Sequence, residues 1–156
     1  MEVPIKIFTA CTNGNVELVQ QLIASGLDIN EPQFSTKSTP VHLASISGKR
    51  RVLKLLLRSG ALVDAVDKVG RTALHHAAAW NNERTAKDLI KFRTNVNAQA
   101  TDGKTPLAIA AHKGCARRSS ACSSISARTL THLTRTGVAR STMLFSQSTK
   151  SVWTCS

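Results

Sequence analysis

Aromatic side chains are scarce in this chain: tyrosine is absent, and the aromatic residues together make up 4% of 156 positions. Sandwiches and barrels of β-strands usually build their cores from aromatic and β-branched residues. The composition instead favours a core of Leu, Val, Ile and Ala carried on short helices. The apolar content of 42% is sufficient for one ordinary folded domain.

Long apolar segments are also missing. No run approaches the roughly 18 apolar residues that a membrane span requires. The N-terminal string Met-Glu-Val-Pro-Ile-Lys lacks the basic and then apolar order of a signal peptide. We therefore expect a protein of the cytoplasm or the nucleus that has no membrane partner.

Side chains for catalysis or metal binding do not occur in recognisable patterns. The four cysteines form no C-x-x-C pair and have no histidine at metal-ligand spacing; they are Cys11, Cys115, Cys122 and Cys155. His76 and His112 likewise lack a cysteine or carboxylate at nucleophile or metal spacing. No glycine-rich phosphate loop is present, and the nine acidic residues are scattered. The sequence predicts a protein that is not an enzyme and that uses no cofactor or metal.

The positive charge is unevenly distributed. The formal net charge is +12, but residues 1–116 hold all nine acids together with 15 Lys and Arg, an excess of +6. Residues 117–156 hold six Lys or Arg and no acid, which adds another +6. Half of the net charge therefore comes from the last quarter of the chain.

The sequence has one regular feature, a pattern that repeats every 33 residues. The pattern reads Thr39-Pro40 to Gly48, then Thr72-Ala73 to Asn81, then Thr105-Pro106 to Gly114. A period of that length indicates a stack of units, each too small to bury its apolar face without its neighbours. An earlier unit fits with an offset of 34 residues, and its extra residue falls in the loop from Glu31 to Lys37.

Each unit predicts two short helices. Threonine is a good N-cap, proline is preferred at the first helical position, and apolar residues follow at helical spacing. Gly48 and Asn81 are residue types that tolerate the left-handed conformation of a C-cap. A second helix with an apolar stripe follows, and Gly60 then leads the chain into an extended turn toward the next unit.

Three strings resemble the ankyrin repeat: Ser38-Thr-Pro-Val-His-Leu-Ala44, Arg71-Thr-Ala-Leu-His-His-Ala77 and Lys104-Thr-Pro-Leu-Ala-Ile-Ala110. The resemblance covers about residues 5–116 and implies an all-α solenoid of about three and a half repeats. Its domain would span residues 1–116, with units at 1–34, 35–67 and 68–100 and an incomplete unit at 101–116. The residues that match the motif are Thr39, Pro40, His42, Gly48, Gly60, Thr72, His75, Gly103, Thr105, Pro106 and Gly114.

The chain departs from the ankyrin pattern at three positions. Arg93 stands where the family usually has a left-handed glycine, Asn81 replaces another glycine, and Ala108 replaces the motif histidine. We expect Arg93 to strain its helix cap by about 1 kcal/mol. The resemblance also implies that the motif histidine, here His42 and His75, fixes neighbouring loops through hydrogen bonds.

By resemblance, such stacks bind proteins through turn tips and exposed positions of the inner helices. The tips correspond to Lys37, Lys68, Arg71 and Lys104, and the inner-helix positions to Ile46, Ser47, Ala79, Trp80, His112 and Lys113. Trp80 is favoured as an anchor because binding hot spots are rich in tryptophan, and the alternative is that it fills a groove between neighbouring repeats. The implied function is a non-enzymatic scaffold or adaptor for protein partners that the sequence does not identify.

Two other functions stay open. The run Lys49-Arg50-Arg51, with Lys54 and Arg58 at helical spacing, forms a basic face that is either solvated or binds an acidic protein or nucleic acid. Together with the basic tail it would suit a nucleic-acid-associated protein, although the interleaved acids and scarce aromatics argue against base stacking. The third possibility is the targeting module of a larger multidomain enzyme.

The last unit of the stack, residues 101–116, has room for a first helix but no second one. Terminal repeats need polar outer faces for a stable stack. We therefore expect the apolar side formed by Ala86, Leu89 and Ile90 to be poorly covered, and the stack to melt from its C-terminal end.

After Ala116 the repeat stops, and 17 of the last 40 residues are Ser or Thr. One interpretation is a natural low-complexity tail that is disordered. The other is a further repeat read in the wrong frame. When the last base of each codon is joined to the first two of the next, Trp153-Thr154 gives Asp, and Ser141-Thr142 can give the motif His in register. We hypothesise that the frame slips near Arg117 and that the chain is a truncated version of a longer ankyrin protein.

The frame hypothesis predicts that the transcript across the codons for Gly114 to Arg128 contains a slip or an alternative junction. Sequencing that transcript checks it directly. An alternate frame that holds stop codons or lacks a repeat would make the basic Ser/Thr tail a genuine part of the protein.

Overall fold

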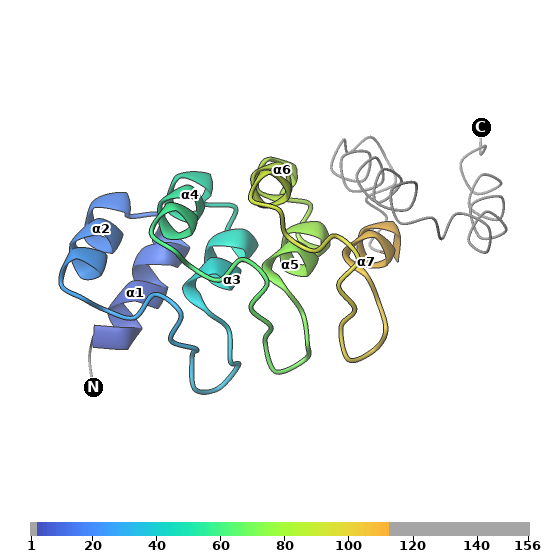
Figure 1. The fold of residues 1–156 in the computed structure, drawn as a ribbon, viewed down its shortest axis with the longest axis horizontal. Coiled ribbons are helices and arrows are strands. Elements are labelled where there is room, and N and C mark those ends of the chain that lie inside the picture. Colours follow the sequence, from blue (N-terminus) through green and yellow to red (C-terminus); the bar gives the residue numbers. More distant parts are fainter. Residues whose placement is uncertain (1–2, 113–156) are drawn as a thin grey trace, which may run out of the picture.

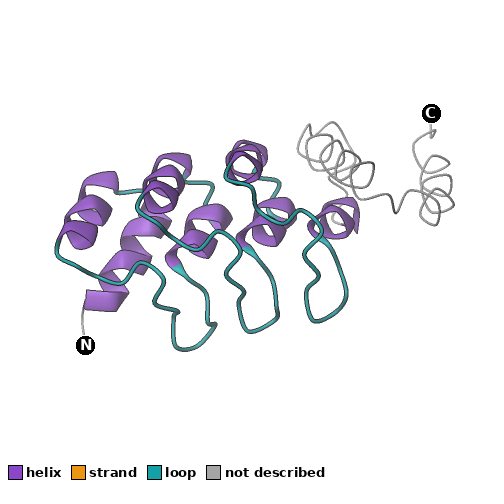
Figure 2. Cartoon of the chain, viewed as in Figure 1, coloured by secondary structure: helices purple, strands orange, loops and turns teal. Residues whose placement is uncertain are grey.

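A computed structural model of the chain describes residues 3–112. Within this range it contains seven α-helices and no β-strand, which confirms the all-α fold class (Figures 1 and 2). The helices are α1 (Val3–Asn13), α2 (Val16–Ala24), α3 (Pro40–Ile46), α4 (Arg50–Arg58), α5 (Ala73–Ala79), α6 (Glu83–Lys91) and α7 (Pro106–His112). None of these helices is long and apolar enough to cross a membrane.

The helices form two parallel rows. α1 packs on α3, α3 on α5 and α5 on α7, and we name this the inner row. α2, α4 and α6 make the outer row, each paired with the helix before it in the chain. Figure 1 shows a long loop after each outer helix, projecting beyond the inner row before the next inner helix begins. We name these loops finger 1 (residues 25–39), finger 2 (59–72) and finger 3 (92–105).

The inner helices are short because their ends are capped at both sides. Thr39 and Thr72 are the N-cap residues of α3 and α5, with extended backbone, and Pro40 follows Thr39 as the first helical residue. Gly48 follows the C-cap of α3 and adopts the left-handed region, with φ of 66°. A Cβ at Gly48 would lie 2.9 Å from Oδ1 of Asn82. Glycine is favoured there by its backbone conformation, and a side chain would also have to displace the amide of Asn82.

Asn82 occupies that space because its side chain joins two repeats. Its Nδ2 donates to the carbonyl oxygens of Ser45 (2.7 Å) and Ile46 (2.8 Å) at the end of α3. These carbonyls are among the last of a helix, which have no partner within the helix itself. One side chain of the following unit therefore completes the hydrogen bonding of the preceding helix end.

A single apolar core runs through the stack. Leu53 and Leu56 of α4, Leu74 of α5 and Leu89 of α6 are completely buried. The expectation that Ala86, Leu89 and Ile90 are poorly covered is wrong, since their exposed fractions are 0%, 0% and 7%. The reason is that α6 packs against α4 and α5, so this side chain stripe faces helices that precede it in the chain.

Three residues other than glycine adopt the left-handed backbone conformation. Arg93 has φ of 62°, Asn81 has 54° and Lys37 has 53°. Each stands one repeat away from a glycine in the same region: Gly60, Gly48 and Gly70 respectively. The conformation expected at Arg93 from the family pattern is therefore present. Lys37 occupies a position that glycine fills in the following two fingers. The sequence analysis predicted only that Lys37 lies at a turn tip, and not that its backbone is left-handed.

The C-terminal part of the sequence falls outside the described residues. Lys113, Gly114 and the whole segment 117–156 belong to this part. The expected disorder of the tail, its frame slip and the closing glycine of the fourth unit therefore stay predictions. The division into units at 1–34, 35–67, 68–100 and 101–116 also stays a proposal, compatible with three helix pairs followed by α7.

Replacing Arg93 with glycine should stabilise the protein by about 1 kcal/mol, because a Cβ disfavours the left-handed region. Asn81→Gly should stabilise it less, since asparagine tolerates this region better than arginine. Urea unfolding of the purified chain measures both effects. The control is Gln20→Gly at an exposed position within α2, which should destabilise by about 1 kcal/mol. A loss of stability in Arg93→Gly comparable to that control would contradict the strain at this cap.

Candidate protein-binding surface

The three fingers are joined edge to edge. The backbone N–H of Lys68 donates to the carbonyl of Thr36 (3.1 Å), which links finger 2 to finger 1. The backbone N–H of Thr101 donates to the carbonyl of Val69 (3.1 Å), and its hydroxyl donates to the same oxygen (2.9 Å), which links finger 3 to finger 2. The finger tips therefore form one continuous surface whose spacing is set by backbone hydrogen bonds.

Two buried histidines hold the fingers against the inner helices. In α3, Nδ1 of His42 accepts the backbone N–H of Thr39 (3.1 Å) and lies 2.9 Å from its hydroxyl oxygen. Nε2 of His42 lies 3.0 Å from the carbonyl oxygen of Arg71 in the next finger. His75 repeats this arrangement one unit later, with Thr72 and with the carbonyl of Lys104 at the same distances.

These contacts fix the protonation state of both rings. A backbone N–H can only donate, so Nδ1 must carry no proton, and Nε2 then carries the proton that it donates to the carbonyl. Burial lowers the pKa of His42 and of His75 below the usual 6.5, against the raising effect of the carbonyl partner. Each histidine thus acts as a neutral bridge between a helix start and the following finger.

Asp67 organises the turn of finger 2. Its Oδ1 accepts the backbone N–H groups of Val69 (2.8 Å) and Arg71 (2.9 Å), and its Oδ2 lies 2.9 Å from Nε2 of His76. Burial would raise the pKa of Asp67, but the hydrogen bonds from Arg71, His76 and Val69 together lower it below its usual value. The carboxylate is therefore held ionised, and it shapes the tip rather than offering a free acid to a ligand.

The positions chosen from the family resemblance fall into two groups on the inner side of the stack. Lys37, Lys68 and Lys104 are exposed on the fingers, whereas Arg71 is half-buried. The second group lies at the C-terminal ends of the inner helices: Ile46 and Ala79 are the last residues of α3 and α5, Ser47 and Trp80 follow them as C-caps, and His112 ends α7. Lys113 lies outside the described residues.

Trp80 is the most exposed large side chain of the second group. Its exposed fraction is 63%, so it does not fill a groove between neighbouring repeats. Asn13, which stands at the equivalent position two units earlier, lines a groove on the inner side. The repeat geometry therefore turns Trp80 toward the same surface.

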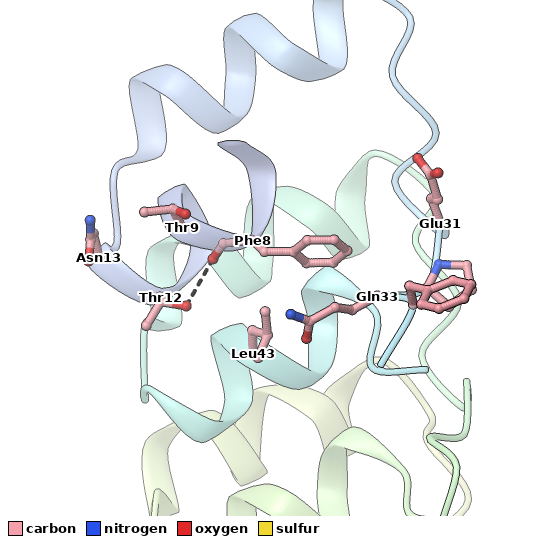
Figure 3. A pocket seen from close by; sticks show the side chains of 9 residues that line it. Phe8, Thr9, Thr12, Asn13, Glu31, Gln33 and Leu43 are labelled. Atoms are coloured by element: carbon pink, nitrogen blue, oxygen red, sulfur yellow. Dashed lines mark hydrogen bonds between the residues drawn. The ribbon is translucent and has the colours of Figure 1, made fainter. Parts of the chain in front are cut away.

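The groove beside Asn13 has a volume of about 590 Å³ (Figure 3). It lies between α1, α3 and finger 1, and Phe8 and Leu43 contribute its apolar side chains from the two helices. Gln33 reaches between them from the finger, as Figure 3 shows. Phe34 completes the groove at the finger and is fully exposed, with an exposed fraction of 103%.

Phe34 is not among the surface residues predicted from the sequence, although the extra residue in its loop is visible there. In finger 1 the N–H of Lys37 donates to the carbonyl of Gln33, four residues back, whereas in finger 2 the N–H of Gly70 donates to Asp67, three residues back. The extra residue of the 34-residue offset thus enlarges the turn of finger 1. Phe34 lies inside this enlarged turn, between Gln33 and Lys37, with its side chain fully exposed.

The described residues contain no cluster of His, Cys, Asp or Glu that is placed to hold a metal ion. Cys11 is buried in the core, and burial raises the pKa of its thiol to about 12. A thiol in this state is a poor nucleophile because the reactive thiolate is disfavoured. Cys11 therefore serves the packing of the core.

Paired helices stacked in two rows, with hydrogen-bonded fingers along one of them, define the class of helical repeat solenoids. Comparison with protein families identifies the particular kind: residues 7–100 match the model of three ankyrin repeats, and the chain belongs to the ankyrin-repeat family. Repeats of this family generally mediate protein–protein interaction, typically as non-catalytic modules.

Similar proteins include several that are much longer. The chain is 35% identical over 100 residues to the Neurogenic locus Notch protein of Drosophila melanogaster, covering 64% of this chain and 4% of that protein. It is 32% identical over 119 residues to Dauer abnormal formation protein 25 of Caenorhabditis elegans, covering 68% and 31% respectively. It is 36% identical over 85 residues to the Probable E3 ubiquitin-protein ligase XBOS33 of Oryza sativa subsp. japonica, covering 54% and 16%. The alignments thus span less than a third of each of these relatives.

The neutral histidine bridges predict that stability falls with acid below about pH 6.5. Unfolded histidine binds a proton more readily than His42 or His75 does in the fold, so protonation favours the unfolded chain. His75→Ala should cost about 2 kcal/mol at neutral pH and make the pH dependence shallower. Urea midpoints between about pH 7.5 and 5.5 measure this, with His112→Ala at the exposed end of α7 as the control. An unchanged slope in His75→Ala would contradict the neutral bridge.

Proposed function

We propose that this protein is a non-enzymatic scaffold or adaptor that binds a protein partner across the inner surface of its ankyrin stack. The observation that carries the proposal is the exposure of two large aromatic side chains on that surface, Phe34 and Trp80. Burying an exposed aromatic side chain against a partner gains much apolar contact area, and aromatic residues are enriched among binding hot spots.

The geometry of the inner surface supports a protein ligand. The groove between α1, α3 and finger 1 places apolar Phe8 and Leu43 beside the polar Thr12 and Asn13, a mixture typical of protein interfaces. Exposed cations follow along the finger tips: Lys37 on finger 1, Lys68 on finger 2, and on finger 3 Lys104, which pairs with Asp102 at 3.1 Å. Because backbone hydrogen bonds and the His42 and His75 bridges hold the fingers in place, the surface is ordered before a partner arrives.

A second candidate is that the stack serves as a targeting module within a larger protein. The observation that favours it is the small share of each relative that the chain matches, together with the hypothesis of a slipped reading frame near Arg117. On this view the inner surface binds the same kind of partner, and any catalytic activity belongs to other domains. The placement of the protein in the cytoplasm or nucleus is a further proposal, which rests on the sequence alone.

Site-specific photo-crosslinking tests the inner surface directly. A photoreactive phenylalanine analogue at position 34 or position 80 should give a discrete crosslinked product with the same cellular protein. The matched control places the analogue at Gln20, an exposed position of the outer helix α2, where no such product should form.

Two outcomes would overturn the proposal. Equal products from Gln20 and Trp80 would show that the inner surface is not selective. Products that disappear after nuclease treatment, with no protein adduct left, would favour the nucleic-acid-associated alternative. Each variant keeps the histidine bridges and the core, so that folding can be verified by its far-ultraviolet circular dichroism.

A further inference from the structure

The outer row of helices contains a second groove, which is not part of the proposed inner binding surface. It lies between α4 and α6, has a volume of about 390 Å³, and is lined by Arg50, Arg84, Lys87, Asp88, Ile90 and Lys91. Four of these six side chains are cationic and one is acidic. The groove thus sits on the opposite row of helices from the fingers (Figure 1).

The single acid of this groove is already neutralised. The side chain of Asp88 is only 1% exposed, and both Nε and Nη2 of Arg50 donate to it, the latter at 3.1 Å from Oδ1. Nζ of Lys54 lies 3.6 Å from the same Oδ1. Burial would raise the pKa of Asp88, but the hydrogen bond and charge of Arg50, with a smaller contribution from Lys54, lower it.

This ion pair arranges the basic run predicted from the sequence. Arg50 and Lys54 are not freely solvated, because they connect α4 to Asp88 on α6. The side chain of Arg50 remains 45% exposed, so its guanidinium is oriented by Asp88 and is still accessible at the edge of the groove. An ordered cation loses less side-chain entropy when it binds a second anion.

α6 adds a stripe of cations along the same groove. Lys87 and Lys91 follow Arg84 by three and seven residues, so that all three lie on one face of the helix. Lys87 pairs with Glu83 on its own helix, and within residues 3–112 Arg84 and Lys91 form no salt bridge with a carboxylate. Both are exposed, and their charges therefore remain available to a ligand.

We propose that the groove between α4 and α6 binds an acidic segment of a protein partner, with Arg84 and Lys91 receiving its carboxylates. The groove already contains one arginine–carboxylate contact, in which Arg50 binds the carboxylate of Asp88 through two N–H groups. Ile90 also lines the groove but is only 7% exposed, so the cations make up most of what a ligand can reach. Among residues 3–112 no aromatic ring lines the groove, so this part of the chain offers a nucleic acid no stacking platform there.

The test uses a short fluorescent peptide of alternating Glu and Leu, its Gln and Leu counterpart, and the full 156-residue chain. The acidic peptide should bind, the neutral one should not, and Arg84→Glu/Lys91→Glu should weaken binding by about tenfold or more. The matched control is Arg51→Glu/Arg58→Glu, which makes the same charge change at exposed positions of α4 outside the groove lining. It should weaken binding by less than about threefold because bulk ions screen distant charges.

A charge-swapped peptide gives an independent readout. A peptide of alternating Lys and Leu should bind the Arg84→Glu/Lys91→Glu variant better than the original chain. Equal losses in the two double variants would overturn the proposal, since binding would then follow net charge and not the groove. A single-stranded oligonucleotide that binds more tightly than the acidic peptide, and that depends on Arg84 and Lys91, would overturn it in favour of nucleic acid. The peptide experiment tests only the outer groove, so its result does not depend on the result of crosslinking at Phe34 and Trp80.

Discussion

The neutral histidine bridge is the interaction on which the rest of this structure depends. His42 and His75 each satisfy the first turn of an inner helix through Nδ1 and hold the next finger through Nε2. Both contacts require the same uncharged tautomer, and burial favours it. The capping of a helix and the position of a neighbouring repeat are therefore set by one side chain, which couples local structure to the stacking of units.

The bridge is confined to the middle of the stack. The equivalent position is Phe8 in the first unit and Ala108 in the fourth, and neither side chain can bridge two polar groups. In finger 1 the absence of a bridge coincides with an enlarged turn, and Phe8 lines a groove with Phe34 in place of a hydrogen bond. The first unit thus loses a structural contact and presents an apolar surface, which is where we place part of the partner-binding site.

Two surfaces of different chemistry follow from the two rows of helices. The inner side exposes Phe34 on finger 1 and Trp80 at the C-terminal end of α5, whereas the outer side presents cations ordered by the buried Asp88. Because each unit of a solenoid contacts only its neighbours, both sides of every unit remain open to solvent. On the two binding proposals made above, one stack would hold an apolar surface on its inner side and an acidic segment on its outer side at the same time.

The fold can be predicted from the sequence, because a 33-residue period, helix caps and apolar stripes recur at fixed offsets and each is a local property of the chain. The left-handed positions at Arg93 and Asn81 follow from the same repeat pattern. The pairing of the cations is visible only in the folded structure, since Arg50 meets Asp88, which lies 38 residues further along the chain. The exposure of Phe34 and the burial of Ala86, Leu89 and Ile90 are also visible only there, because burial depends on neighbouring units that a single repeat does not specify.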